Sequence, residues 1–247
     1  MSEIEGIYTI FLREIIRFWR DKSRLVSSLV QPLLFLIVFG GGFSFVRLGS
    51  INYQTFLFPG VVAISVVGIS IASGVSVIWD REFGFLKEIL VAPISRTSIF
   101  IGKALGGCAT ALVQGIIILS LSFIIGIPIT LNSFVVSIFL MALISLGLVS
   151  VGLIIASLVE TLESFGMIMN FIIFPLIFLS GAFFPLQEAP EWLRIISLVN
   201  PLTYGVEAIR YTIIGFSSIP FSLSLTIITA FSFATILLGG IAFSRQK

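Results

Sequence analysis

Six apolar runs recur along the chain, and each is long enough to cross about 30 Å of hydrocarbon as a helix. They cover residues 25–45, 56–78, 104–127, 134–158, 165–184 and 223–243. Pro32 and Pro175 lie inside two of these runs and are expected to bend them, which neighbouring helices tolerate in a membrane. The pattern predicts an all-α integral membrane protein with six transmembrane helices, and we interpret residues 1–247 as a single domain.

Residues 1–24 show a different pattern, in which apolar and charged residues alternate at helical spacing. The apolar residues share one face, and the opposite face carries a stripe of arginines: Arg13, Arg17, Arg20 and Arg24. A helix with these two faces is expected to lie flat at the lipid headgroups as an interfacial amphipathic helix. Packing on a soluble core is the alternative, but the chain offers no such core. The segment also lacks the short apolar core of a signal peptide.

The densest charge between two apolar runs lies in residues 79–103, which read WDREFGFLKEILVAPISRTSIFIGK. Asp80 is placed to cap a short helix, and Pro93 is placed to end it. The apolar residues between them fall on one side at helical spacing: Phe83, Leu86, Ile89 and Leu90. This spacing predicts an amphipathic helix between the second and third spans. An ordinary charged loop that only fixes the membrane topology is the alternative.

The distribution of Lys and Arg predicts which side of the membrane each connection occupies. Eleven of the fourteen lie in the N-terminal segment, in residues 79–103 or at the C-terminus, at Arg245 and Lys247. The remaining three would lie on the other side: Arg47, Arg194 and Arg210. By the positive-inside rule, both termini and the charged loop are therefore cytoplasmic. We expect a multi-pass protein of the plasma (inner) membrane.

The longest outer connection, residues 185–222, is predicted to contain two short helices. The first runs through Trp192. Asn200 and Pro201 form a strong start signal for the second, with Asn as cap and Pro in the first turn. The charged residues of this second helix lie three apart and could form an ion pair: Glu207 and Arg210. Helices that dip into the outer leaflet fit this pattern, and a cap on the surface is the alternative.

Small and polar residues inside the spans indicate helix contacts. Gly102 with Gly106, and Gly68 with Ala72, have the spacing that lets two helices approach closely. Polar side chains in the spans are more typical of hydrogen bonds between helices than of a substrate pathway, and they are few: Gln31, Gln114, Asn170 and scattered Ser and Thr.

The composition, 57% hydrophobic and 11% charged, excludes a soluble globular protein. Histidine is absent and Cys108 is the single cysteine, so the sequence predicts no disulfide, no catalytic triad and no metal site. The six predicted spans contain no Asp, Glu, Lys or Arg. This absence disfavours proton-coupled carriers and channels built on charged rings.

A phosphate-binding loop is also missing, because Gly102-Lys103 is followed by Ala104 rather than by Ser or Thr. If transport is active, its energy has to arrive from another polypeptide, and the charged loop is the obvious place. An apolar pathway suits an amphipathic or lipid-like cargo. An intramembrane lipid-modifying enzyme and a membrane scaffold are the alternatives from other functional classes.

Two long segments resemble the most recognisable parts of ABC-2 type transporter membrane subunits: WDREFGFLKEILVAPISRTSIFIGKALGG and FPLIFLSGAFFPLQEAPEWLRIISLVNPLTYGVEAIR. QPLLFLIVFGGGF resembles the first span of the daunorubicin-resistance and Nod-factor export branch. The resemblance implies six spans, an N-terminal interfacial helix, a cytoplasmic coupling helix in residues 79–98 and re-entrant helices before the sixth span. It also implies a dimer of membrane subunits, which we expect to be a homodimer, and two copies of a separate ATPase subunit.

In this resemblance, ATP and Mg bind to the partner ATPase, and the chain itself binds no cofactor and no nucleic acid. The lipid bilayer surrounds it, and the cargo is a drug or a lipid-linked saccharide moved outward. The ATPase-coupling positions are Arg81, Glu82, Gly84, Glu88, Pro93, Ser95 and Arg96. Glu82 and Glu88 would face the ATPase, and Pro93 would set the turn. Glu160 and Glu163, in the other cytoplasmic connection, are either a second contact or solvated acids. The outer re-entrant segment, which would shape the exit, contains Pro185, Trp192, Asn200, Pro201, Glu207 and Arg210.

Overall fold

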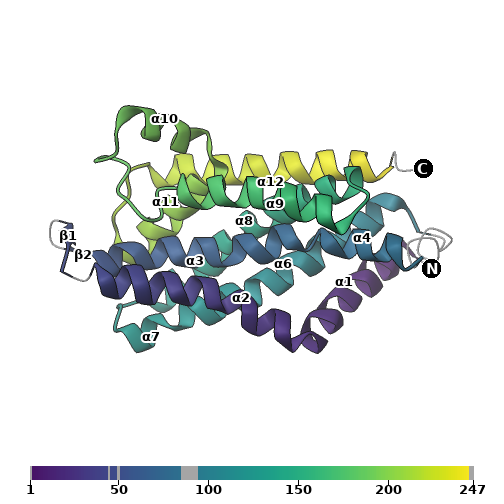
Figure 1. Ribbon diagram of the computed structural model, residues 1–247, viewed down its shortest axis with the longest axis horizontal. Coiled ribbons are helices and arrows are strands. Elements are labelled where there is room, and N and C mark those ends of the chain that lie inside the picture. Colours follow the sequence, from purple (N-terminus) through teal and green to yellow (C-terminus); the bar gives the residue numbers. More distant parts are fainter. Residues whose placement is uncertain (1, 44, 49–50, 85–93, 245–247) are drawn as a thin grey trace.

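The computed structural model describes residues 2–43, 45–48, 51–84 and 94–244, and these residues are mostly helical (Figure 1). The described part therefore confirms the predicted all-α class, with a short antiparallel hairpin, β1 (Arg47–Leu48) and β2 (Ile51–Asn52), as an addition. The helical elements are α1 (Glu3–Arg20), α2 (Lys22–Leu34), the π-helix η1 (Phe35–Gly41), α3 (Tyr53–Ala72), α4 (Val75–Glu82), α6 (Arg96–Ser120), α7 (Ser122–Ile125), α8 (Leu131–Leu158), α9 (Leu162–Phe178), α10 (Glu191–Val199), α11 (Pro201–Ile214) and α12 (Phe221–Ser244).

Short polar side chains set the first residue of several helices, because they accept hydrogen bonds from amides that have no partner within the helix. Ser2 begins α1 with a capping box, in which Glu5 accepts from the Ser2 amide in return. Asn200 caps α11 and Pro201 occupies its first turn, as the sequence predicts. The same capping role at α6, α8 and α9 belongs to Ser95, Thr130 and Thr161.

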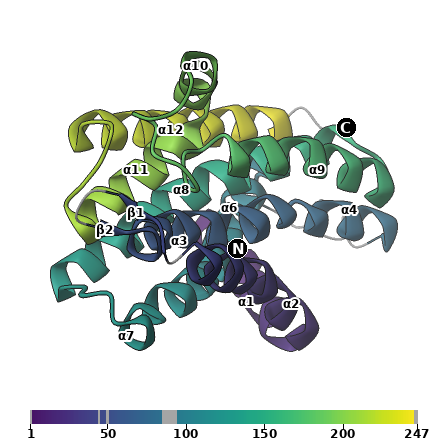
Figure 2. The same cartoon turned by 60° about the vertical axis from the view of Figure 1, so that its left-hand side comes forward.

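The long helices lie side by side along the long axis of the molecule (Figure 1). α3 is central and buried along most of its length, and it contacts α6, α8 and α11. α4, the first turns of α1 and the last turns of α12 lie at one end, whereas the β hairpin and α10 lie at the other. Figure 2 shows α10 at the periphery and α1 and α2 diverging from the bundle. The two ends of the molecule therefore carry different sets of connections.

Four helical stretches of the described residues are long and apolar enough to cross a membrane: Tyr53–Glu82, Arg96–Ile125, Leu131–Leu158 and Phe221–Ser244. They correspond to the predicted runs 56–78, 104–127, 134–158 and 223–243. A fifth is possible if Glu3–Arg20 and Leu25–Gly41, which meet at a bend of 73°, are taken as one span. The structure thus supports four to five spans by length and composition, and the count of six stays a prediction.

α9 does not match the predicted run 165–184. It begins at Leu162 and ends at Phe178. Its 17 residues rise about 26 Å, which is less than the roughly 30 Å of a hydrocarbon core. The chain then turns, and Gly181 takes a φ of 70°, a left-handed conformation that glycine adopts without strain. Hydrophobicity alone overestimates this helix because the apolar residues continue through the turn.

The first apolar run contains the π-helix η1, which follows α2 and begins three residues after Pro32. Two of its aromatic rings, Phe35 and Phe39, contact Phe183 with centroid distances of 5.1 and 5.4 Å. Phe183 follows α9, so these contacts connect the first apolar run to the chain segment between α9 and α10. Aromatic pairs at such distances add to the apolar area that they bury.

α1 packs on α6 through small residues. A Cβ built on Gly102 would lie 2.8 Å from Cβ of Ile10, and one built on Gly106 would lie 2.6 Å from Cβ of Glu14. The close approach predicted for Gly102 and Gly106 is therefore confirmed, whereas Gly68 faces open space among the described atoms. The opposite face of α1 exposes large apolar side chains: Ile4, Tyr8, Leu12, Ile16 and Trp19. Its location at the lipid headgroups stays a prediction.

Two helix backbones come very close where α3 ends against α8. A Cβ built on Gly152 would lie 2.3 Å from the carbonyl oxygen of Ile71. We expect Gly152→Ala to lower the free energy of unfolding by about 1–3 kcal/mol, because two backbones have to separate. Without the contact, alanine would stabilise the helix by about 1 kcal/mol relative to glycine. A decrease in the free energy of unfolding would therefore indicate that the added Cβ meets the neighbouring backbone.

Thermal unfolding of the purified protein in detergent measures this effect. Gly166→Ala is the matched control, because a Cβ at Gly166 of α9 meets nothing within 4 Å. The control is expected to be neutral or slightly stabilising. Equal melting temperatures for the two variants would contradict the close crossing.

Candidate coupling site

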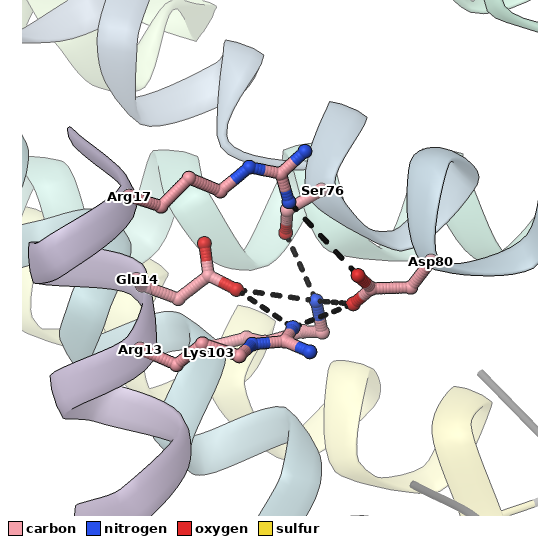
Figure 3. A network of polar contacts seen from close by, with 6 residues as sticks. All are labelled: Arg13, Glu14, Arg17, Ser76, Asp80 and Lys103. Atoms are coloured by element: carbon pink, nitrogen blue, oxygen red, sulfur yellow. Dashed lines mark hydrogen bonds and ion pairs between the residues drawn. The ribbon is translucent and has the colours of Figure 1, made fainter. Parts of the chain in front are cut away.

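Charged side chains from three helices meet at the end of the molecule that contains α4 (Figures 1 and 3). Arg13, Glu14 and Arg17 come from α1, Asp80 from α4 and Lys103 from α6. Helical spacing places Arg13 and Arg17 one turn apart on the same face of α1. These five residues are called the ionic cluster below, and they connect helices that flank the charged loop.

Asp80 is the centre of the ionic cluster. Its Oδ2 atom lies 2.6 Å from Nη2 of Arg13 and 2.6 Å from Nζ of Lys103. Nη1 of Arg17 lies 3.9 Å from Oδ1 of Asp80. Oε1 of Glu14 lies 3.1 Å from Nη2 of Arg13 and 3.4 Å from Nζ of Lys103. Figure 3 shows the Lys103 ammonium between the two carboxylates.

Lys103 and Asp80 are almost completely buried, with side chains that are 1% and 5% exposed. The three N–H groups of the lysine donate to Asp80, to Glu14 and, at 3.0 Å, to the hydroxyl of Ser76. A buried ammonium can stay charged when all its donors have partners. The ionic cluster combines three cations with two carboxylates, so its net charge is +1 when all five groups are ionised.

The prediction that Asp80 caps a short helix is wrong. Asp80 lies within α4 and is buried rather than at a helix start. A capping bond is a local preference worth about 1 kcal/mol. Two cations at 2.6 Å outweigh that preference, because they compensate a carboxylate that the fold removes from water.

The arginine stripe of α1 is only partly directed away from the protein. Arg13 and Arg17 are half-buried and face Asp80, and the guanidinium of Arg17 lies 4.4 Å from the ring centroid of Trp79. Arg20 is exposed, and Arg24 lies in α2 rather than α1. Part of the arginine stripe therefore contacts α4. The sequence pattern did not indicate this contact, because it only places the stripe opposite the apolar face of α1.

Both described ends of the charged loop are bonded to other parts of the protein. Arg81 donates to the carbonyl of Val159 at 2.8 Å, in the connection between α8 and α9 that also contains Glu160, whereas Glu163 lies in the first turn of α9. The Glu3 carboxylate accepts from the amide and the hydroxyl of Ser95 at 3.1 and 3.0 Å. Hydrogen bonds from Ser98 and Ser95 lower the pKa of Glu3 from its ordinary value. The loop is thus held at both ends by α1 and the α8–α9 connection.

The other predicted coupling residues fall near these anchors or outside the described residues. Glu82 is exposed at the end of α4, Gly84 has a φ of 77°, and Arg96 is the first residue of α6. Glu88 and Pro93 lie in residues 85–93, outside the described residues. The predicted amphipathic helix has most of its residues in the same stretch, so it stays a prediction.

In the outer segment, the predicted ion pair between Glu207 and Arg210 is confirmed, and both side chains are fully buried. Arg210 also donates to the carbonyl of Gly181 at 2.8 Å, and its guanidinium lies 4.2 Å from the ring centroid of Phe56. Glu207 accepts from the amide of Ser218. The pair thus connects α11 to α3 and to the chain segments before α10 and α12. Pro185 lies in the first of these segments, whereas Trp192 is exposed on α10.

Glu14, Ser76 and Lys103 belong to this site, and sequence reasoning missed them. A signal was present, since Lys103 directly precedes an apolar run and Glu14 interrupts the arginine stripe. Each is a charge that would be costly to bury alone. Their common partner, Asp80, could not be identified from spacing because three different helices contribute to the site.

The family model for ABC-2 type transporters matches residues 5–214, a range that contains both the ionic cluster and α11. The chain belongs to the ABC-2 type transporter family. The putative transport permease ycf38 of Cyanophora paradoxa is 35% identical over 235 residues, which cover 93% of this chain and 81% of that protein. The inner membrane transport permease YadH of Escherichia coli strain K12 is 26% identical over 230 residues, with 92% and 90% covered. The probable multidrug ABC transporter permease YbhR of the same strain is 32% identical over 157 residues, with 63% and 42% covered.

Membership of the ABC-2 type transporter family confirms the resemblance seen in the two long sequence segments. It identifies the chain as an integral membrane protein of the permease type, in agreement with its long apolar helices. The daunorubicin-resistance and Nod-factor branch stays a prediction.

Removing the central carboxylate tests the role of the ionic cluster in stability. Asp80→Asn is expected to lower the free energy of unfolding by about 3–5 kcal/mol, because buried cations lose their compensating charge. Replacing both partners, as in Asp80→Leu with Lys103→Met, is expected to recover part of that loss. Thermal unfolding in detergent measures both variants.

Glu82→Gln is the matched control, because Glu82 lies two residues after Asp80 but is exposed. Its effect is expected to stay within about 0.5 kcal/mol. An Asp80→Asn variant as stable as the parent protein would show that the buried carboxylate does not hold the three helices together.

Proposed function

We propose that this member of the ABC-2 type transporter family is the membrane subunit of an exporter driven by a separate ATPase subunit, which binds residues 79–98. The observation that carries the proposal is the ionic cluster. It joins the two helices that flank this segment, α4 and α6, to each other and to α1. The family match and the permease names of the relatives support the membrane part of the proposal.

In this proposal, closure of two ATPase copies on ATP displaces the charged loop through Arg81, Glu82, Gly84, Glu88, Pro93, Ser95 and Arg96. The anchors at the loop ends support rigid transmission. Arg81 is bonded to the carbonyl of Val159, at the end of α8, and Ser95 is bonded to Glu3 of α1. A displacement of the loop would therefore reach α8 and α1 directly. Glu82 and Glu88 would give the contact its orientation by charge complementarity. ATP and Mg would bind only to the partner.

The proposed subunit crosses the membrane six times. Four spans are the continuous helical stretches, and the other two are the bent first apolar run and α9. The first turns of α1 and the last turns of α12 lie at the same end of the molecule, which supports an even number of crossings (Figure 1). The positive-inside rule then places that end in the cytoplasm. One complete set of spans per chain is compatible with a homodimer in the plasma membrane.

The outer segment, residues 185–222, is proposed to shape the exit of the cargo. α11 is buried against α3, α8 and α12, which favours a re-entrant helix over a cap on the surface. Glu207 and Arg210 would keep α11 in this position, with Asn200 and Pro201 setting its first turn. A displacement of α3 would reach α11 through the contact between Phe56 and Arg210.

The cargo is proposed to be an amphipathic or lipid-like molecule, either a drug or a lipid-linked saccharide. Apolar residues dominate the helices that would line a pathway, which suits such molecules. One relative, YbhR, is named a probable multidrug ABC transporter permease, and this name supports a drug as the cargo of YbhR. A lipid-modifying enzyme and a scaffold are not favoured, because the relatives are permeases.

Reversing one charge of the loop tests where the ATPase binds. Glu88→Lys is expected to weaken association with the co-purifying Walker A subunit about tenfold, since opposing a complementary charge costs at least about 1.4 kcal/mol. Membrane insertion is expected to be normal. Co-purification from native membrane in mild detergent provides the measurement.

Glu188→Lys is the matched control, because Glu188 is an exposed acid three residues before α10, in the outer segment. It is expected to retain the partner. Loss of the partner in both variants, or in neither, would count against a binding site on the charged loop.

The purified chain alone is expected neither to hydrolyse ATP nor to move a solute uphill in liposomes, because it has no phosphate-binding loop in its sequence. Nucleotide hydrolysis and solute accumulation are assayed in the same vesicles. Adding the Walker A subunit is expected to restore both activities. Activity without that subunit would eliminate the proposal.

A further inference from the structure

A pocket of about 230 Å³ opens beside the ionic cluster, between α1 and the end of α4. Its lining consists of Arg13, Arg17, Trp79, Asp80 and Phe83. Most of the lining surface is apolar, and the charged members are two arginines and one aspartate. Figure 3 shows both arginines extending from α1 toward Asp80. The pocket thus combines cationic groups with an apolar wall.

Arg17 is the cation of this pocket that keeps unused hydrogen-bond donors. Its Nη1 atom lies 3.9 Å from Oδ1 of Asp80, which is too long for a hydrogen bond. Within the described part of the chain, its guanidinium donates to no acceptor. The face of the guanidinium lies 4.4 Å from the ring centroid of Trp79, and such stacking leaves the N–H groups at the edge available. The side chain is 34% exposed, so a ligand can reach it.

The surplus positive charge of the ionic cluster also lies at Arg17. Asp80 is 2.6 Å from both Arg13 and Lys103. The carboxylate of Glu14 contacts the same two cations. The net charge of +1 therefore resides mainly on Arg17, the cation most distant from both carboxylates. An anion with one negative charge would balance the cluster, and its oxygens would accept from the free N–H groups.

The position of the pocket along the helix indicates which anion can reach it. Trp79 and Asp80 lie in the last turn of Tyr53–Glu82, a stretch long and apolar enough to cross a membrane, and Phe83 follows it. The end of a span lies at the depth of the lipid headgroups, where tryptophan is enriched. Phe83 is 70% exposed, and contact with lipid is more favourable for its ring than contact with water. At this depth the phosphates of the lipids are the nearest anions.

We propose that this pocket binds the phosphate of an anionic phospholipid. Arg17 donates to the phosphate oxygens, and Trp79 and Phe83 contact the glycerol and the first part of the acyl chains. A phosphodiester with an uncharged headgroup carries one negative charge and neutralises the cluster, whereas a choline headgroup adds a cation and restores the surplus. The bound lipid would hold α1 against α4 at the membrane surface. This inference goes beyond the proposed function, because it requires no ATPase and does not concern the cargo.

Native mass spectrometry of the purified chain in dodecyl maltoside tests the ligand. The probes are phosphatidylglycerol and phosphatidylcholine with the same acyl chains. We expect one phosphatidylglycerol per chain, bound about tenfold more tightly than phosphatidylcholine. Equal affinities would overturn the proposal. Inorganic phosphate at the same concentration is expected to leave phosphatidylglycerol bound, and displacement by it would show that the site takes a soluble anion instead of a lipid.

Arg17→Gln tests the location of the site. It is expected to weaken phosphatidylglycerol binding about tenfold and to leave phosphatidylcholine binding unchanged, because only the anionic lipid needs the cation. Asp80 keeps two cations at 2.6 Å in this variant, which supports folding. Arg20→Gln is the matched control, since Arg20 is an exposed arginine one turn later in α1 and does not line the pocket. Equal weakening in both variants would indicate diffuse surface charge and would overturn the assignment.

Phe83→Ala tests the apolar wall and does not depend on the folding of the arginine variant. Phe83 is exposed, so its removal is expected to leave the fold intact. We expect phosphatidylglycerol binding to weaken about threefold, because the lipid loses apolar contact. Phe45→Ala is the matched control, since Phe45 is 78% exposed and lies outside the pocket. Unchanged phosphatidylglycerol affinity in the Phe83→Ala protein would overturn the proposed lipid contact.

Discussion

The burial of Asp80 between Arg13 and Lys103 is the interaction on which the arrangement of α1, α4 and α6 depends. Neither the carboxylate nor the ammonium can leave water alone without a cost of several kcal/mol. Apolar packing tolerates small rotations of a helix, whereas ion pairs at 2.6 Å weaken when a rotation separates their atoms. Gly102 and Gly106 make it possible, because their missing side chains let α1 approach α6 until Glu14 reaches Lys103.

A second buried ion pair has the same effect at the other end of the molecule. Glu207 and Arg210 combine a local pair within α11 with bonds to two chain segments outside it. Between the two ends, α3 and α8 meet through Gly152 and Ile71 with almost no space for adjustment. Ion pairs near both ends of the molecule, with a close backbone contact between them, favour motion of the helices as rigid bodies. The proposed coupling to an ATPase at one end of the molecule would use this property.

Sequence analysis was reliable where the interacting residues are neighbours in the chain. The cap at Asn200, the following Pro201 and the pair Glu207–Arg210 all lie within a few residues, so helical geometry specifies them. Asp80 was misassigned because its partners lie 67 and 23 residues away, and no local pattern encodes such distances. The end of α9 was misplaced because hydrophobicity reports contact with an apolar environment rather than backbone conformation. The ionic partners of Asp80 and the end of α9 thus needed the fold, whereas the cap at Asn200 and the pair Glu207–Arg210 did not.

Gln114 of α6 donates a hydrogen bond to the Ser28 carbonyl of α2 at 2.7 Å. This bond has a consequence for biosynthesis. Chains enter the membrane from the N-terminus, so α2 is inserted before the ribosome has made residue 114. Until then, Pro32 leaves this carbonyl without an amide donor from its own helix, in a solvent that offers no substitute. The Ser28 carbonyl of α2 therefore gains its side-chain donor only when α6, which carries Gln114, packs beside α2.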